Sequence, residues 1–83
     1  MAAVSIKKAL MKIYLISIDD WGYDSFSDFV IAANSEDEVR GIAMDAAGDE
    51  GKAAWQGAEI KEIGIYTGES LSPVIISESF HAG

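Results

Sequence analysis

The sequence has no cysteine and only one proline among its 83 residues. Without cysteine there is no disulfide framework, no thiolate metal site and no thiol nucleophile, which suits a reducing cytoplasm. No apolar run approaches the roughly 20 residues that a membrane-spanning helix needs. We therefore expect a cytoplasmic protein that does not enter a membrane.

Basic residues are also scarce, with six against 14 acids and a net charge of −8. Three of the six, Lys7, Lys8 and Lys12, precede residue 13, so the rest of the chain carries 14 acids and three bases. A field of this sign repels nucleic acids and anionic membranes and attracts cationic clefts. The alternative is that the acidity only maintains solubility.

The length fits one domain, and 49% hydrophobic with 24% charged residues is ordinary for a globular chain. Met11-Lys12 before an apolar run reads like a natural start. We therefore assign residues 1–11 to an N-terminal extension or alternative start and 12–83 to a single domain. The competing interpretation is a short amphipathic segment that covers part of a sheet.

Four stretches predict strands, at 13–18, 29–33, 60–66 and 74–80, and the first is apolar on both faces, as in a central strand. Ser35 followed by Glu38 is typical of a helix start, and apolar residues then recur at helical spacing up to a stop at Gly48. The segment 49–57 is ambiguous and admits a second short helical turn that places Trp55 against the sheet.

The order strand–strand–helix–strand–strand (ββαββ) predicts an α+β fold, a two-layer sandwich. With strands numbered along the chain, a right-handed crossover favours a four-stranded antiparallel sheet of order 2-1-3-4, with one main helix on one face. We expect the other face to be partly open. The N-terminal extension, Trp55 or a second subunit are the candidates to cover it.

The segment 19–28 joins the first two strands and interleaves four aspartates with three aromatic rings, without a base. The rings can anchor a partner while the carboxylates accept bidentate bonds from arginine. Alternatively, the rings fold back onto the sheet edge and the aspartates are solvated; the two interpretations are compatible. Acids at the helix start extend the same surface. The predicted partner-binding residues are Asp19, Asp20, Trp21, Tyr23, Asp24, Phe26, Asp28, Glu36 and Asp37.

The sequence gives less support to a metal site or a catalytic site. The aspartates of 19–28 are oxygen ligands suited to Ca²⁺, but they lack the spacing, central glycine and final glutamate of an EF-hand loop. His81 stands next to the end of the chain, where an oriented partner and a pocket are seldom found. We expect no enzyme, no catalytic residue, no metal and no cofactor. Carboxylates along one face of an extended segment fall about 6–7 Å apart, a spacing that can imitate a phosphate backbone.

Several short motifs from residue 11 onward are distinctive when taken together: Asp19-Asp20, Tyr23-Asp24, Phe26, Phe29 to Ala33, Ser35-Glu36 with Arg40, Trp55, Ile63-Gly64 and Ser79 to Gly83. In these residues the chain resembles a group of small, mostly uncharacterised proteins carried by phages and prophages. The closing stretch resembles a Ser-Phe-Asn-Ala-Gly ending, with His81 in place of asparagine, which argues further against a catalytic histidine.

Several anti-CRISPR proteins are similar in kind, being small, acidic, α+β and non-catalytic. The resemblance implies a phage-derived inhibitor of the anti-CRISPR type in the host bacterial cytoplasm, acting as a nucleic-acid mimic on a basic site of an effector complex. The alternative is a phage accessory or structural module that homodimerises or docks into a larger particle. The expected state is a monomer or a homodimer, with no direct nucleic-acid binding and no membrane binding.

Overall fold

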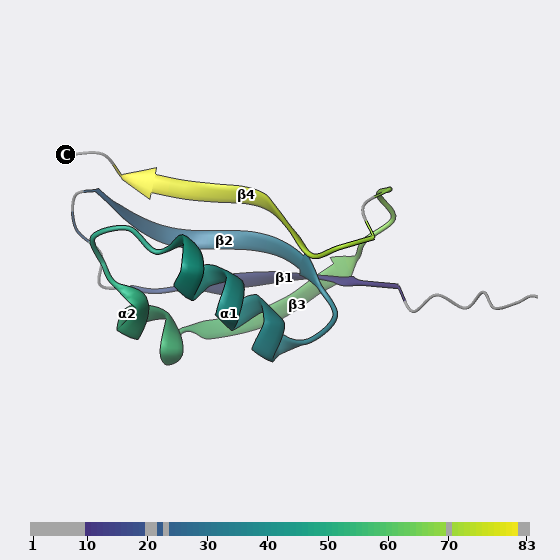
Figure 1. The fold of residues 1–83 in the computed structure, drawn as a ribbon, viewed down its shortest axis with the longest axis horizontal. Helices are drawn as coiled ribbons and strands as arrows, with labels where there is room; N and C mark the ends of the chain where they lie inside the picture. Colours follow the sequence, from purple (N-terminus) through teal and green to yellow (C-terminus); the bar gives the residue numbers. More distant parts are fainter. Residues whose placement is uncertain (1–9, 20–21, 23, 70, 82–83) are drawn as a thin grey trace, which may run out of the picture.

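The computed structural model describes residues 10–19, 22, 24–69 and 71–81, so most of the predicted extension lies outside the described part. One sheet and two helices form the described chain (Figure 1). None of these helices is long and apolar enough to span a membrane. The elements are β1 (Lys12–Ser17), β2 (Ser25–Ala33), α1 (Glu36–Ala46), α2 (Lys52–Gln56), β3 (Glu59–Ile65) and β4 (Val74–His81).

The strands form one sheet in the order β3-β1-β2-β4, and each neighbouring pair is antiparallel. The α+β class, the four-stranded antiparallel sheet and the interior position of β1 are confirmed. The fourth strand, however, lies beside β2 and not beside β3 as the order 2-1-3-4 placed it. After β3 the chain crosses the end of the sheet before it enters β4 (Figure 1).

The physical reason for this placement is the length of β2. The strand begins at Ser25 and not at Phe29, so it offers a nine-residue edge to β4. At one end of that edge the rings of Phe26 and Phe80 lie 4.8 Å apart. Residues 25–28 thus belong to a strand, and the hairpin tip is shorter than the segment 19–28 that the sequence suggested.

Both helices cover the same face of the sheet, and the core lies between the two layers. The ring of Trp55 lies 5.0 Å from that of Phe29, and both side chains are fully buried. Burial of each such large side chain contributes roughly 1.5–3 kcal/mol. The second short helix and the core position of Trp55 are confirmed, which means that Trp55 does not cover the opposite face. The main core comprises Tyr14, Ile16, Phe29, Ile31, Val39, Ala43 and Trp55.

Helix α1 begins as predicted. Ser35 Oγ accepts a 3.2 Å bond from the Glu38 N–H, while Glu38 Oε1 accepts a 2.7 Å bond from the N–H of Asn34. These bonds satisfy amides that the first turn leaves without intrahelical partners. The helix ends at Ala46, two residues before the expected stop at Gly48. Gly48 serves a different purpose, because a Cβ there would stand 2.6 Å from the backbone oxygen of Asp24.

The second face of the sheet carries Ile13, Leu15 and Val30, all partly exposed. Leu15 stands opposite Val30 on β2 and opposite Lys61 on β3. No helix of the described chain covers this face, as the sequence led us to expect. It is therefore an apolar surface without a partner among the described residues.

Candidate functional site

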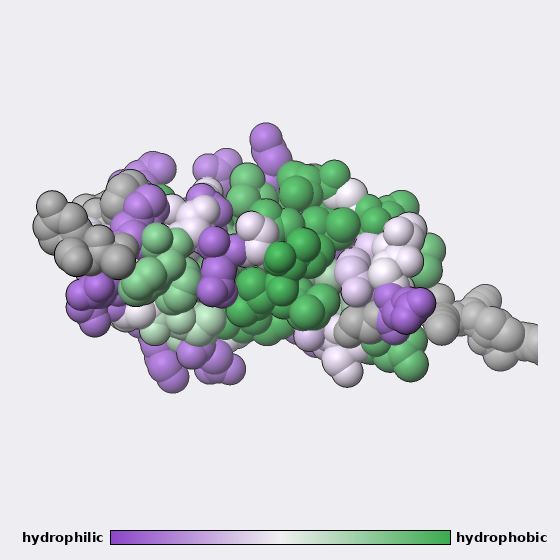
Figure 2. All heavy atoms as spheres, turned by 90° about the horizontal axis from the view of Figure 1, so that it is seen from above, coloured by the Kyte–Doolittle hydropathy of each residue, from purple (hydrophilic) through white to green (hydrophobic). Residues whose placement is uncertain are grey.

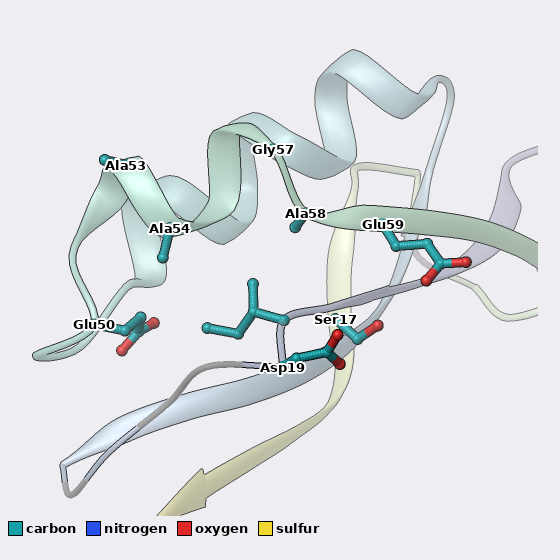
Figure 3. A pocket seen from close by; sticks show the side chains of 9 residues that line it. Ser17, Asp19, Glu50, Ala53, Ala54, Gly57, Ala58 and Glu59 are labelled. Carbon is teal, nitrogen blue, oxygen red and sulfur yellow. The ribbon is translucent and has the colours of Figure 1, made fainter.

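An open cleft of about 660 Å³ lies between α2 and the adjacent ends of β1 and β3 (Figure 3). Its volume is in the range of about 300–1,000 Å³ that small-molecule sites occupy. Three carboxylates line the cleft, and none of the lining residues is basic. The lining residues are Ser17, Ile18, Asp19, Glu50, Ala53, Ala54, Gly57, Ala58 and Glu59.

The carboxylates are divided between the two ends of the cleft. Glu50 lies at one end, while Asp19 and Glu59 lie at the other, with Ser17 beside them (Figure 3). Asp19 and Glu59 are exposed, whereas Glu50 is half-buried. The side formed by α2 presents only alanines and glycine. A long cationic side chain could therefore enter without displacing a bulky group.

Strand pairing places the two exposed acids. Ser17, the last residue of β1, stands opposite Glu59, the first residue of β3. The Ile18 N–H then donates a 3.0 Å bond to the Ser27 oxygen, which extends the β1–β2 pairing by one residue before the chain reaches Asp19. Residues 40 positions apart in the sequence therefore meet at one corner of the sheet.

Arg40 fixes the α2 wall of the cleft. Its Nη1 donates to the backbone oxygens of Trp55, Gln56 and Ala58, at 2.9, 2.9 and 3.0 Å. These oxygens belong to the end of α2 and the residues after it, where a helix leaves carbonyls without intrahelical partners and favours a cation. Arg40 thus joins α1 to α2 and sets where β3 begins. Arg40 itself does not line the cleft.

Glu50 joins three segments through one carboxylate. Its Oε2 accepts a 2.6 Å bond from the Trp55 indole, and its Oε1 accepts backbone bonds from Phe26 at 3.1 Å and Gly48 at 3.0 Å. Burial raises the pKa of Glu50, but the bonds from Trp55 and the backbone N–H groups outweigh it, so the net pKa lies below the usual 4.5. The cleft therefore keeps this carboxylate ionised.

The predicted residues of the hairpin fall into three groups. Asp19 lines the cleft, whereas Asp20, Trp21 and Tyr23 lie outside the described residues. Asp24 has a φ of 56°, and its backbone oxygen accepts a 2.8 Å bond from the N–H of Asp49. The base of the hairpin is thereby attached to the loop between α1 and α2.

Two further predicted residues have partners within the chain. The half-buried Phe26 ring lies 4.9 Å from Phe29 as well as near Phe80, so it packs at the sheet edge. The carboxylate of Asp28 accepts a 3.0 Å bond from Ser79 and a 3.4 Å contact from Ser27. Neither side chain lines the cleft.

Glu36 and Asp37 lie in the first turn of α1, at the far end of that helix from α2 (Figure 1). Eleven residues at about 1.5 Å per residue separate the two ends of α1 by about 15 Å. The structure therefore does not bring this pair to the cleft. Glu36 and Asp37 form a separate acidic site on the surface.

Glu50 and Glu59 were not among the predicted site residues. Glu50 belongs to a run of acids that a solvated helix face explains, and Glu59 directly precedes the strand predicted at 60–66. The only local signal was the Gly48-Asp49-Glu50-Gly51 turn ahead of a tryptophan. The link between Glu50 and the hairpin depends on the tertiary fold.

Three polar side chains, Ser27, Asp28 and His81, lie together where β2 pairs with β4. Ser27 Oγ lies 2.9 Å from Nε2 of His81, and the two oxygens of Asp28 contact the hydroxyls of Ser27 and Ser79. These contacts join β2 to β4. Among the described residues, no three potential ligands lie close enough together to hold a metal ion.

Comparison with known proteins gives no match to a family model, to a curated protein or to a solved structure. Functional inference therefore depends on the geometry and charge of the cleft.

Proposed function

We propose that this protein is a non-enzymatic, phage-derived inhibitor of a host defence system, of the anti-CRISPR type. It binds the basic nucleic-acid site of an effector complex. The observation that supports this proposal is the open cleft with Asp19, Glu50 and Glu59 around it and no basic lining residue. Such a cleft suits an arginine or lysine side chain of the effector.

The charge of the chain supports the same proposal. Lys12 and Glu62 form an exposed ion pair of 3.4 Å. Arg40 is engaged with backbone oxygens. Most of the acids that the structure describes are exposed, and the chain has a net charge of −8. Such a surface accelerates encounter with a cationic site, and salt reduces the effect.

The mechanism requires occupancy and no turnover. An arginine of the effector enters between Asp19 and Glu59, where charge-assisted and bidentate bonds are strongest. Acids of the hairpin contact neighbouring bases that otherwise hold phosphates. The effector then cannot bind its nucleic acid while the inhibitor is in place.

The test compares two double variants of equal charge change. Asp19→Asn with Glu59→Gln alters the cleft, and Glu36→Gln with Asp37→Asn alters the far end of α1. Inhibition of target DNA binding is measured for a panel of purified CRISPR effector–guide complexes, at several salt concentrations. We expect the cleft pair to weaken inhibition at least about tenfold, because charge-assisted bonds contribute roughly 1.5–3 kcal/mol each. The control pair should change it less than about threefold, as expected for rim charges.

Equal losses from both pairs would mean that net charge and not the cleft governs binding. Absence of inhibition across the panel would remove the anti-CRISPR assignment.

The apolar sheet face supports a second candidate function, that of a phage accessory module that homodimerises. Ile13, Leu15 and Val30 are partly exposed on it. This function predicts a mass that rises with concentration in sedimentation. Leu15→Lys, but not the cleft pair, should then return the protein to a monomer.

A further inference from the structure

We infer that β4 is a strand-addition site that pairs with an extended segment of the cationic partner. This inference rests on the proposed function for the sign of the partner's charge. In the sheet β4 is an edge strand, with β2 as its single neighbour among the described strands. Its outer backbone donors and acceptors therefore face away from the sheet, as at any edge that accepts an added strand.

The two edges of the sheet differ in how they resist pairing. β3 carries Glu59, Lys61 and Glu62 within seven residues, and charged side chains on an edge discourage a further strand. β4 carries a single charge, Glu78, within eight residues, and it opens with Val74-Ile75-Ile76. Branched residues of this kind favour the extended conformation. β4 is thus the receptive edge.

Apolar side chains are exposed along β4 and just before it. Ile76 is 47% exposed, Phe80 is 48% exposed and Leu71 is 84% exposed. From the side of this edge, apolar atoms form a broad area over the middle of the molecule, with polar atoms mostly around it (Figure 2). A continuous apolar area on a small acidic protein marks a contact surface.

The register indicates which part of β4 pairs. A shift between Val30 and Ile31 leaves Ile76 without an opposite residue on β2. Beyond it, five consecutive residues from Ser77 to His81 each have an opposite residue. An added strand has its longest regular run there, with Ile76 and Phe80 as apolar contacts at the two ends.

Charge identifies the occupant. β2 and β4 together contain Asp28 and Glu78 and no lysine or arginine. Ser79 bonds to Asp28 Oδ1 at 3.0 Å, which places this carboxylate next to β4. A lysine of the added strand that faces the same way as Ser79 would approach this carboxylate from a position one strand spacing, about 4.8 Å, outside β4. A second copy would bring a further net −8 and a β4 without a base. The occupant is therefore a segment of alternating apolar and basic residues.

The probe is a seven-residue peptide of alternating valine and lysine, blocked at both ends. Amide exchange of the full chain is followed by mass spectrometry with and without this peptide. At about 90% occupancy, we expect exchange in Val74–His81 to slow by up to about tenfold and exchange in Glu59–Ile65 to stay unchanged. A peptide with glutamate in place of lysine, and one with N-methylated valines, should give no protection.

Matched variants localise the effect. Asp28→Asn removes the carboxylate that the peptide lysines approach and should weaken binding of the lysine peptide severalfold, whereas Glu62→Gln on the opposite edge should leave it unchanged. Protection of Glu59–Ile65, or equal binding by the N-methylated peptide, would overturn the inference. Protection of β4 that rises with protein concentration in the absence of peptide would assign the edge to a second copy and also overturn it.

The outcome is separable from that of the proposed function. The cleft pair Asp19→Asn with Glu59→Gln leaves β4 intact and should still show peptide protection, even if it no longer inhibits an effector. Conversely, Asp28→Asn tests the edge while the three cleft carboxylates are retained.

Discussion

The indole N–H of Trp55 donates a 2.6 Å hydrogen bond to Glu50, so the fully buried tryptophan is coupled to a carboxylate of the cleft. The same carboxylate accepts backbone bonds from Phe26 and Gly48. Core packing, the start of β2 and the turn between the helices therefore meet at one ionised group. A substitution of Trp55 or of Glu50 should therefore alter the surroundings of the other residue.

The first prediction concerns the charge of Glu50. Glu50→Gln removes the charge that strengthens three bonds, and we expect a loss of about 1–3 kcal/mol in the free energy of unfolding. Urea unfolding followed by tryptophan fluorescence measures it in a Trp21→Phe background, where Trp55 is the sole reporter. Asp45→Asn, an exposed change of equal charge on α1, is the control and should alter stability by less than about 0.5 kcal/mol. Equal stability of the Glu50→Gln protein would show that the three bonds need no charge.

The second prediction is a pH dependence. Because the folded pKa of Glu50 lies below 4.5, its ionised form stabilises the fold fully above the unfolded pKa. This contribution is lost as the pH falls through the folded pKa. The stability difference between wild type and Glu50→Gln should thus be constant from pH 7 to about 5 and shrink below about 4.5. Urea titrations at intervals of about half a pH unit measure this difference. If the stability difference grows as the pH falls, the folded pKa of Glu50 is raised and not lowered.

The third prediction concerns Gly48. A Cβ at this position would stand 2.6 Å from the Asp24 backbone oxygen, so Gly48→Ala must displace the base of the hairpin. We expect a cost of about 1–3 kcal/mol, as for other overpacked sites. Gly41→Ala in α1 is the matched control, since its new methyl group meets no atom within 4 Å. That change should stabilise the helix by about 0.5–1 kcal/mol. The melting temperatures of both variants are measured by calorimetry. If both variants shift the melting temperature in the same direction, the predicted difference between the two sites is wrong.

The fourth prediction concerns Arg40, whose Nη1 donates to three carbonyls around the end of α2. Arg40→Met keeps the apolar stem and leaves these oxygens without their donor, and we expect a loss of roughly 1–3 kcal/mol. Arg40→Lys, a compact cation without the planar fork, should recover only part of it. Amide exchange of residues 52–60 measures the effect locally. Full recovery by lysine would mean that charge alone suffices.

Much of the fold was predictable because local signals agree with the tertiary contacts. Ser35 and Glu38 act within one helical turn, so sequence spacing is enough to find them. The apolar residues of β1 predict an interior strand for the same reason. The position of β4 was not predictable in this way, because it depends on ring contacts between Phe26 and Phe80, 54 residues apart.

The residues of the cleft were harder to predict from the sequence than the fold was. Asp19 was selected for its place in an acidic segment, but the segment suggested a linear surface. The structure instead combines Asp19 with Glu59 from another strand and Glu50 from a turn. Single acids of this kind carry no pattern along the chain. The β1–β3 register, the Arg40 contacts and the bonds that Glu50 accepts bring them together.

The backbone oxygen of His81 accepts a bond from the Asp24 N–H, so the end of β4 stands beside the base of the acidic hairpin. The chain enters β1 at the opposite end of the sheet (Figure 1). An affinity handle or fluorophore placed directly after β4 would therefore crowd this corner. Surface immobilisation through the amino-terminal side leaves the same corner accessible, and binding data from the two orientations should differ for that reason alone.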